Sequence, residues 1–423
     1  MKAGLNRREF VKSAAAVAAG TLVSPTGLFA AGSETIKVGL VGCGGRGNGA
    51  LNDFLNAAKH LNLKVEIAAL ADFFKERADG TAEKFGVSKD IAYGGADAYK
   101  KVMASDAQIV LMATPPISRP AHFEAAVKAG KHIFMEKPVA VDPPGARKII
   151  AMGKEAAQKG LSIVAGTQRR HEAAYLKTKY AIDQGAIGPI RGGAIWWCGG
   201  ALWYKKREPG ESDASYMVRN WVSFTEMSGD HIVEQHVHNI DVANWFIGRT
   251  PELAIGFGGR ARRKTGNQFD FFSVDFDYGD GVHIHSMCRQ INGTYSRVSE
   301  YFTGTLGGTW GSGPGKEGFP KKVDIPEIPY VGNPYVQEHV DLLESILNGK
   351  PINEAENVAT STLTGIMGRI SAYTGQLVRW KDLVDETTGS PWYNLTLSPT
   401  EADFENNTVQ APADEICAIP GKE

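Results

Sequence analysis

The spacing of hydrophobic residues divides the chain into two regions with different patterns. Between residues 36 and 165, short apolar runs alternate with amphipathic helical stretches, which is typical of a parallel sheet with crossover helices. This pattern predicts a doubly wound α/β domain. Its predicted strands are Ile36–Gly42, Val65–Leu70, Ile109–Ala113, His132–Met135 and Ser162–Ala165. Its predicted helices are Gly47–His60, Phe74–Phe85, Pro120–Ala129 and Pro144–Gly160.

After Gln168 the pattern changes to longer strands between glycine-rich turns, with one helical stretch over Gly229–Phe246. Alternation of apolar and polar residues in the segment 270–278 predicts that one face of the sheet is buried. We therefore expect an α+β domain with a large, open, mostly antiparallel sheet. Its predicted strands are Arg191–Cys198, Glu252–Gly258, Asp270–Tyr278, Val282–Ile291 and Ser299–Thr305.

Three kinds of segment follow these strands. The glycine-rich stretch 304–318 is predicted to be an ordered surface loop, and helical spacing returns over 334–347 and 355–380. Beyond Ser398 the chain is polar and contains proline, so we expect this tail to wrap loosely over the surface.

The charge balance argues against two classes of partner. The 423 residues include 46 Lys and Arg against 47 Asp and Glu, with no basic block and no acidic tail. Nucleic acid and anionic membranes are therefore poor candidates as partners, and no run after the leader is long enough to span a bilayer. The four cysteines are widely spread and have neither metal-type nor redox-type spacing.

The first 31 residues have the features of an export signal. The sequence Arg7-Arg8-Glu9-Phe10-Val11-Lys12 precedes a short, small-residue apolar stretch, and Leu28-Phe29-Ala30 forms an imperfect cleavage site. These features predict a twin-arginine signal peptide and a periplasmic protein; the alternative is a cytoplasmic amphipathic helix. Twin-arginine export moves folded proteins, which suits a protein that must acquire a cofactor before it leaves the cytoplasm.

A glycine-rich turn, Gly42-Cys43-Gly44-Gly45-Arg46-Gly47, separates the first predicted strand from the first predicted helix. In such a turn Gly42 allows the tight bend, Gly44 lets the backbone approach a pyrophosphate, and Gly47 lets the helix pack close to the strand. Asp72 ends the second strand, 25 positions after Gly47. This spacing predicts dinucleotide binding, with the Asp72 carboxylate accepting hydrogen bonds from the adenosine ribose.

The same carboxylate would repel a 2′-phosphate, so NAD is favoured over NADP, although Lys75 and Arg77 lie nearby and soften this preference.

Glu136-Lys137-Pro138 follows the strand His132–Met135. Because the carboxyl ends of parallel strands form the ligand crevice, Lys137 is expected where cofactor and substrate meet.

Together with the glycine turn, several further motifs identify a family resemblance. They are Ala113-Thr114-Pro115, His122, Ala129-Gly130-Lys131-His132, Glu136-Lys137-Pro138 and the stretch Gly229–Asp241. In this order they resemble the glucose-fructose oxidoreductase / inositol dehydrogenase family, written Gfo/Idh/MocA. The resemblance covers nearly all of the chain after the leader.

The resemblance implies an N-terminal Rossmann domain, a C-terminal open sheet that covers the active site, and hydride exchange with a sugar or polyol. We accordingly assign a signal peptide (1–31), an NAD-binding domain (34–166), a substrate-binding and oligomerisation domain (167–398) and a tail (399–423). A homodimer or homotetramer is expected. The expected cofactor-binding residues are Gly42, Gly44, Gly45, Arg46, Gly47, Asp72, Thr114, Pro115, His122 and Glu136.

Oxidation of an alcohol needs a group that accepts its proton, and an imidazole suits this role near neutral pH. We assign His238 as the base and Glu234, four residues earlier on one helix face, as its orienting partner. The resemblance implies that Lys137 binds the reacting oxygen and helps to move its proton. Family members more commonly have Asp at position 234 and a small residue at 236, which indicates a different substrate pocket.

The cluster of Glu234, His236, His238 and Asp241 also suggests a metal site. On a helix, His236 and His238 would point about 200° apart, so we expect no bound metal.

Sugar recognition needs planar donors and aromatic platforms. The expected substrate-binding residues are Lys137, Gln168, Arg169, Arg170, Tyr204, Trp221, His236 and Asp241.

Three functions fit these residues. The first is an exported NAD-dependent oxidoreductase of a sugar or glycoside, with a tightly bound cofactor because the periplasm holds no free NAD to exchange. The second is a redox-neutral glycosidase or lyase that oxidises C3 transiently; a base near C2, such as Tyr204 or His236, would favour it. The third is a noncatalytic sugar sensor, which has no need for Lys137, Glu234 and His238.

Overall fold

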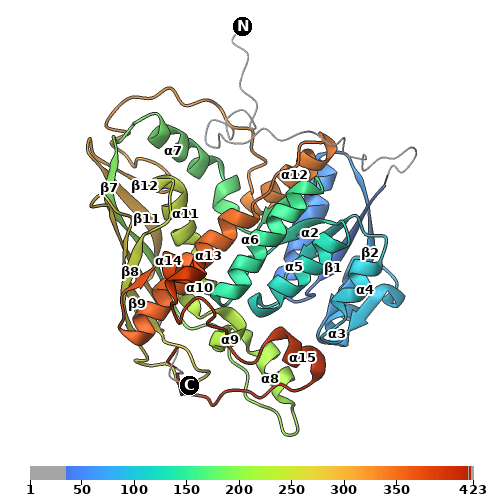
Figure 1. Ribbon diagram of the computed structural model, residues 1–423. Coiled ribbons are helices and arrows are strands. Elements are labelled where there is room, and N and C mark those ends of the chain that lie inside the picture. Colours follow the sequence, from blue (N-terminus) through green and yellow to red (C-terminus); the bar gives the residue numbers. More distant parts are fainter. Residues whose placement is uncertain (1–34, 418, 421–423) are drawn as a thin grey trace.

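The computed structural model describes residues 35–417, 419 and 420. The twin-arginine sequence and the rest of the leader therefore lie outside the described residues. Figure 1 shows two sheet-based halves side by side, with helices α6 (Pro143–Gln158) and α13 (Ala355–Thr374) between them. These two helices pack against each other, so α13 joins the second half of the chain to the first.

The first sheet has six parallel strands in the order β3-β2-β1-β4-β5-β6. This order confirms the predicted doubly wound fold. Its strands are β1 (Thr35–Val41), β2 (Lys64–Asp72), β3 (Ala92–Gly94), β4 (Ile109–Met112), β5 (His132–Met135) and β6 (Ile163–Ala165). The pattern missed β3 because this strand is only three residues long and contains no apolar run.

Helices cover both faces of this sheet, as a parallel sheet requires. On one face Phe54 and Leu343 pack under α2 and α12, and on the other Phe123 and Ile149 pack under α5 and α6. The helices of this half, apart from α6, are α2 (Gly45–His60), α3 (Lys75–Phe85), α4 (Tyr99–Ala104), α5 (Arg119–Lys128) and α12 (Pro334–Leu347). The short 3-10 turns are η1 (Lys89–Ile91), η2 (Pro116–Ser118) and η3 (Gln168–His171).

The second sheet has seven strands in the order β12-β11-β7-β10-β9-β8-β13 and is antiparallel except between β7 and β10. The predicted open, mostly antiparallel sheet is thus confirmed, and β9 buries Phe272, Val274 and Phe276 on one face. Its strands are β7 (Ile190–Gly199), β8 (Leu253–Gly259), β9 (Phe271–Asp277), β10 (His283–Gln290), β11 (Arg297–Gly304), β12 (Gly308–Trp310) and β13 (Val378–Arg379). Strand β12 lies within the stretch that we predicted to be a loop.

The prediction of only one helical stretch among the strands of this half was wrong. The remaining elements are α7 (Ala173–Asp183), α8 (Asp213–Arg219), η4 (Trp221–Ser223), α9 (Thr225–Ser228), α10 (His231–Glu234), α11 (Val237–Ile247), α14 (Lys381–Val384) and η5 (Glu386–Thr388). The predicted helix Gly229–Phe246 is interrupted at Gln235 and His236, where the His236 N–H donates to the carbonyl of His231, five residues back. Glu234 and His238 therefore lie on two consecutive helices.

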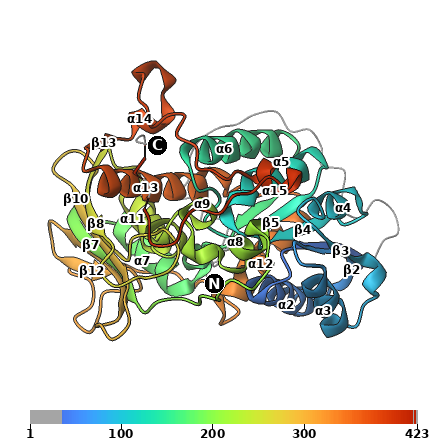
Figure 2. The same ribbon diagram turned by 90° about the horizontal axis from the view of Figure 1, so that it is seen from below.

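The C-terminal tail does not wrap loosely. It forms a helix, α15 (Glu401–Asn406), whose start is fixed by a capping box between Thr400 and Asp403. Figure 1 shows α15 beside α8, and Figure 2 shows it close to α5 of the first half. Buried Phe404 anchors it in a hydrophobic cluster with Tyr216 and Phe224. Long-range packing of this kind leaves no local pattern in a polar tail.

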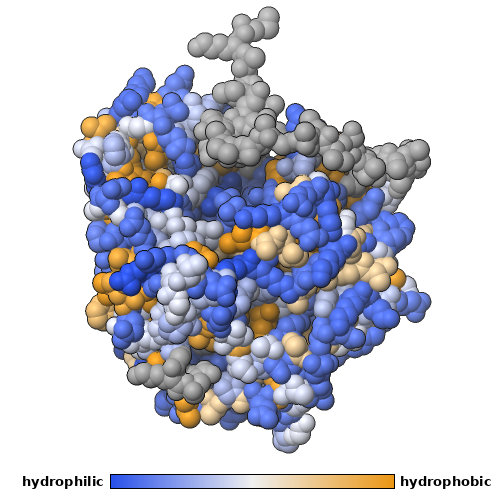
Figure 3. All heavy atoms as spheres, in the orientation of Figure 1, coloured by the Kyte–Doolittle hydropathy of each residue, from blue (hydrophilic) through white to orange (hydrophobic). Residues whose placement is uncertain are grey.

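Among the described residues, no helix is both long and apolar enough to cross a membrane. The face seen in Figure 3 is mostly hydrophilic, with hydrophobic residues in scattered small groups. A few large hydrophobic side chains are exposed on the second sheet. Ile255, Phe257 and Phe271 alternate with buried neighbours along β8 and β9, and Phe257 is 70% exposed.

The contact between α6 and α13 gives a stability prediction. A Cβ atom at Gly153 would lie 2.6 Å from Cβ of Ala355, whereas one at Gly80, on α3, would meet no atom within 4 Å. Alanine normally stabilises a helix relative to glycine by about 0.5–1 kcal/mol. We expect Gly80→Ala to show this gain and Gly153→Ala to destabilise by about 1–3 kcal/mol through overpacking. Urea unfolding midpoints of the two variants test this, and equal shifts would contradict it.

Candidate active site and cofactor cleft

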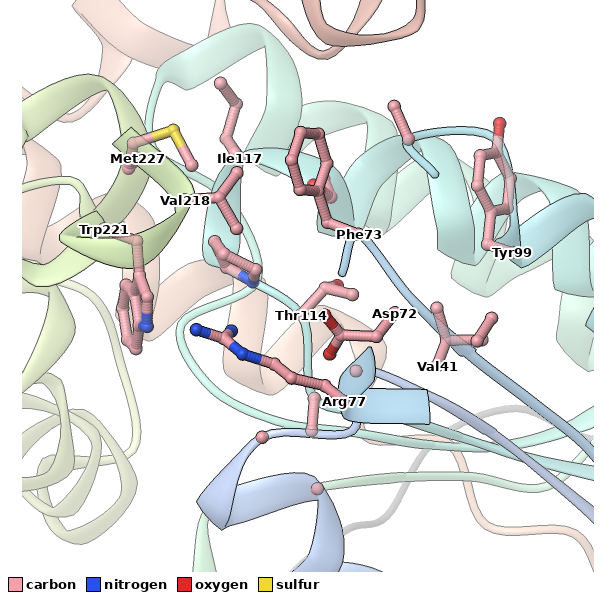
Figure 4. Close-up of a pocket in the computed structure, with 18 of the residues that line it drawn as sticks. Val41, Asp72, Phe73, Arg77, Tyr99, Thr114, Ile117, Val218, Trp221 and Met227 are labelled. Carbon is pink, nitrogen blue, oxygen red and sulfur yellow. The ribbon is translucent and has the colours of Figure 1, made fainter. Parts of the chain in front are cut away.

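A cavity of about 540 Å³ lies where the carboxyl ends of the first sheet meet α8, η4, α9 and α15. One side of the cavity is lined by residues of the first half, which include the glycine turn, Asp72, Arg77 and Thr114. Figure 4 shows Trp221, Val218 and Met227 on the opposite side, reaching in from the second half of the chain. The cavity thus lies between the two halves of the molecule.

The glycine turn has the geometry that a bound pyrophosphate needs. Gly42 has φ +97°, and a Cβ at Gly47 would lie 1.7 Å from the carbonyl oxygen of Gly42. Only glycine fits at these two positions. Cβ atoms at Gly44 and Gly45 would meet no atom within 4 Å, and both residues line the cavity. The backbone here is therefore open to a ligand at the start of α2.

Asp72 is fixed at the end of β2 with its carboxylate at the cavity. It accepts hydrogen bonds from the N–H groups of Cys43 (2.7 Å) and Phe74 (2.9 Å). Burial raises the pKa of Asp72, and these two N–H groups oppose the rise. Arg77 also lines the cavity and lies over the ring of Phe74, whereas Lys75 pairs with Asp79. Of the two predicted neighbouring cations, Arg77 is therefore the one at the cavity.

Thr114, Pro115 and His122 line the same cavity. The Thr114 hydroxyl lies 3.3 Å from Nδ1 of His122, and the guanidinium of Arg119 donates to the Thr114 carbonyl (2.7 Å). Glu136 does not line the cavity, and its carboxylate pairs with Arg46 of α2. The Thr114 contacts thus join the loop after β4 to α5, and the Glu136 contact joins the end of β5 to the start of α2.

Lys137 and Glu234 meet across the two halves of the chain. The Lys137 ammonium donates to the Glu234 carbonyl (2.6 Å) and lies 3.4 Å from its carboxylate. Both side chains are largely buried. In the described chain the carboxylate of Glu234 thus contacts Lys137, and its hydrogen bonds do not include His238. The predicted orientation of His238 by Glu234 is therefore replaced by a Lys137–Glu234 pair.

His238 lies at the same junction, at the start of α11. Its ring stacks on Trp197 of β7, with centroids 5.5 Å apart and planes 21° apart. Burial, and then the positive charges of Lys137 and Arg169, hold the pKa of His238 well below its ordinary value of 6.5. The imidazole is therefore neutral at neutral pH and free to accept a proton.

The predicted arginines lie on η3 and form ion pairs beneath the site. The guanidinium of Arg169 donates to Glu300 (2.6 Å), and Arg170 makes a bidentate pair with Asp241 (2.8 and 2.9 Å). Asp241 also accepts from the Ser361 hydroxyl (2.7 Å) and is 1% exposed. Arg170 and Asp241 therefore pair with each other, and neither lines the cavity.

The other predicted substrate residues differ in their placement. Trp221 lines the cavity, and Gln168 donates weakly to the Tyr335 hydroxyl (3.5 Å). Tyr204 hydrogen-bonds to Tyr216 instead. His236 is fully buried with Nε2 2.8 Å from the Ser286 hydroxyl, and burial lowers its pKa to about 3. The bulge in the helix turns His236 toward the sheet, away from the cavity.

The structure therefore brings Lys137, Glu234 and His238 together and places most predicted cofactor residues around one cavity. Sequence reasoning missed several cavity-lining residues. They include Lys205, Met227, Glu401 and Phe404. The first two lie in irregular or short segments, and the last two lie in the tail, so no periodic signal marks them. The described part of the chain has no cluster of three or more His, Cys, Asp or Glu residues arranged to hold a metal.

Comparison with known proteins supports this reading of the fold. Residues 36–164 match the family described as "Oxidoreductase family, NAD-binding Rossmann fold", and residues 175–309 match the "GFO/IDH/MocA C-terminal domain". The chain is 28% identical over 259 residues to inositol 2-dehydrogenase of Rubrobacter xylanophilus. That match covers 59% of this chain and 63% of the relative, which is less than two thirds of its length.

Two solved structures share the fold. Scyllo-inositol dehydrogenase from Lactobacillus casei with bound NAD(H) and scyllo-inositol has a TM-score of 0.61 at 19% identity, covering 82% of this chain and 99% of that one. Aldose-aldose oxidoreductase from Caulobacter crescentus complexed with glycerol has a TM-score of 0.62 at 16% identity, covering 82% and 99%. With its two matched domains, its parallel sheet and its glycine turn, the chain belongs to the Gfo/Idh/MocA family of oxidoreductases.

Proposed function

We propose that this protein is an exported NAD-dependent oxidoreductase that acts on a hydroxyl group of a sugar, polyol or glycoside. The observation that carries the proposal is the meeting of Lys137, Glu234 and His238 at the junction between the NAD-binding sheet and the open sheet. The inositol dehydrogenases among the similar proteins support this substrate class.

The cavity residues fit a dinucleotide. Open space over Gly44 and Gly45 admits a pyrophosphate, and the buried carboxylate of Asp72 is placed to accept the ribose hydroxyls. The negative charge of Asp72 favours NAD over NADP. NAD, when bound, would take up the hydride from the carbon that bears the substrate hydroxyl.

The chain's own residues handle the proton. The Lys137 ammonium, held by the carbonyl and carboxylate of Glu234, has a free direction in which to donate to the substrate oxygen. This donation polarises the O–H bond, and the neutral imidazole of His238 accepts the proton. In the reverse direction His238 returns the proton to the oxygen. Trp197, stacked on His238, fixes the plane of the imidazole.

The proposed export requires that the protein keeps its cofactor tightly bound. The leader carries the Arg7-Arg8 pair of a twin-arginine signal. The periplasm holds no pool of free NAD. After the reaction with one sugar, a second sugar would therefore return the bound cofactor to its starting oxidation state. The aldose-aldose oxidoreductase with the same fold supports a reaction between two sugars.

The redox-neutral alternative receives no support from the groups that would favour it. His236 is fully buried against Ser286, and the hydroxyl of Tyr204 hydrogen-bonds to Tyr216 and Asp414. Both side chains are thus already hydrogen-bonded to other protein groups. We also propose a homodimer or homotetramer, supported by the exposed hydrophobic residues Ile255, Phe257 and Phe271 on the second sheet.

Removal of the Lys137 ammonium tests the proposed activity. We expect Lys137→Met to lower kcat/KM for the best sugar or polyol substrate by about 10²–10⁴-fold while NAD binding is retained, because Lys137 lies outside the cavity lining. Steady-state kinetics and NADH fluorescence titration measure the two effects. Lys128→Met, on the surface of α5, is the control and should behave as wild type. Unchanged kcat/KM in Lys137→Met would refute the assignment.

The lowered pKa of His238 predicts the acid side of the pH profile. The base works when neutral, and its pKa in the folded protein lies well below 6.5. As pH falls through 6.5, His238 therefore stays neutral, and kcat/KM falls only at lower pH. His238→Gln should remove this limb and most of the activity, whereas His285→Gln, on the outer sheet face, should not. A half-loss of kcat/KM at pH 6.5 or above would contradict the prediction.

Replacing Asp72 tests cofactor choice. We expect Asp72→Asn to raise the Kd for NAD about 10–100-fold through weaker hydrogen bonds to the ribose, and to reduce the preference for NAD over NADP. Asp79→Asn removes a carboxylate of the neighbouring helix that pairs with Lys75 and serves as the control. Fluorescence titration with NADH and NADPH gives both constants. An unchanged ratio of the two constants would show that Asp72 does not set the preference.

A further inference from the structure

The C-terminal segment, residues 399–417, runs beside the cavity. Its helix α15 contributes Glu401 and Phe404 to the cavity lining. Figure 2 shows α15 over the first half of the molecule, close to α5, while the chain that follows runs to the second half. The segment therefore runs from the first half of the molecule to the second.

One end of the segment is attached to the NAD-binding half. The Glu401 carboxylate accepts from the Ser118 hydroxyl (2.7 Å) and lies 3.2 Å from Nε2 of His122. One turn later, Glu405 accepts from the Tyr99 hydroxyl (2.8 Å) and the Lys100 ammonium (2.7 Å). Two carboxylates thus bind four groups that belong to the loop after β4, to α5 and to α4.

The other end is attached to the second half. The Asp414 carboxylate accepts from the Tyr216 hydroxyl (2.8 Å), the Tyr204 hydroxyl (3.2 Å) and the Gly266 N–H (2.7 Å). The Ala411 N–H also donates to the carboxylate of Asp213 (2.8 Å). The segment is therefore fastened on both sides of the cavity.

The covered part of the cavity is the adenosine end. In this fold the acid that ends the second strand binds the adenosine ribose. Phe73 and Ala96 line the cavity next to Asp72, so an adenine bound with its ribose at Asp72 would lie against them. The ring of Phe404 meets Phe73 edge-on, with centroids 6.4 Å apart, and Phe404 is itself buried. Phe404 and Glu401 therefore close the side of the cavity through which an adenosine group would leave.

We infer that the C-terminal segment is a part of the cofactor site that retains the dinucleotide: it covers the adenosine half and must detach from one of its two anchors before the cofactor exchanges. This inference rests on the proposed NAD function. It gives a physical reason for tight retention, because release then requires breaking several hydrogen bonds at once in addition to the contacts with the ligand.

The test compares NADH dissociation from three variants of the full mature protein with wild type. One lacks residues 400–423. A second, Glu405→Gln with Asp414→Asn, weakens both anchors without removing the wall formed by Phe404. The third, Glu415→Gln, removes one exposed carboxylate of the same segment and is the control for a change of surface charge there. NADH-loaded protein is mixed with excess NAD⁺, and the fluorescence decay gives the dissociation rate.

We expect the deletion to raise the dissociation rate at least tenfold, the double variant to raise it several-fold, and Glu415→Gln to leave it unchanged. The double variant keeps the result decisive if the deletion unfolds the protein. Wild-type dissociation rates in the double variant would overturn the inference and leave the proposed function intact. Failure of intact wild-type protein to bind NADH at all would overturn the proposed function and the inference with it.

Discussion

The contact between Lys137 and Glu234 determines the arrangement of the proposed site, because its two members come from different halves of the chain. Lys137 follows β5 of the parallel sheet, and Glu234 ends α10 beneath the open sheet. A largely buried ammonium needs a partner, since an unpaired charge away from water costs several kcal/mol, on the order of 3–5. The pairing therefore fixes the two halves relative to each other at the place where substrate would bind.

Other buried contacts hold the same junction. Arg369 of α13 is almost fully buried and donates to the carbonyls of Val141 in the first half and Gly229 in the second (2.9 and 3.0 Å). Gly153 of α6 packs directly on Ala355 of α13. Close helix packing and a buried guanidinium tolerate little displacement. The geometry of the site is thus supported by elements that never touch it.

Three ion pairs surround His238, whose imidazole is neutral in this site. Three cations lower the pKa of His238 through their positive charge, and they are Lys137, Arg169 and Arg46. Each of the three lies against a carboxylate. These carboxylates belong to Glu234, Glu300 and Glu136. The ion pairs lower the free-energy cost of burying these positive charges. Burial disfavours the protonated form of the imidazole, which therefore remains neutral. The neutral imidazole keeps the nitrogen lone pair that accepts a proton from an alcohol.

The sequence alone determined the glycine turn, the acid at the end of the second strand, the lysine after β5 and the type of each sheet. These features depend on local backbone conformation and on hydrophobic periodicity, and both are written in consecutive residues. Only the tertiary structure decided that His236 faces the open sheet, that Asp241 pairs with Arg170, and that Glu401 and Phe404 of the polar tail line the cavity. Each of these depends on partners tens to hundreds of residues away, and the burial of a polar side chain by such partners leaves no periodic pattern.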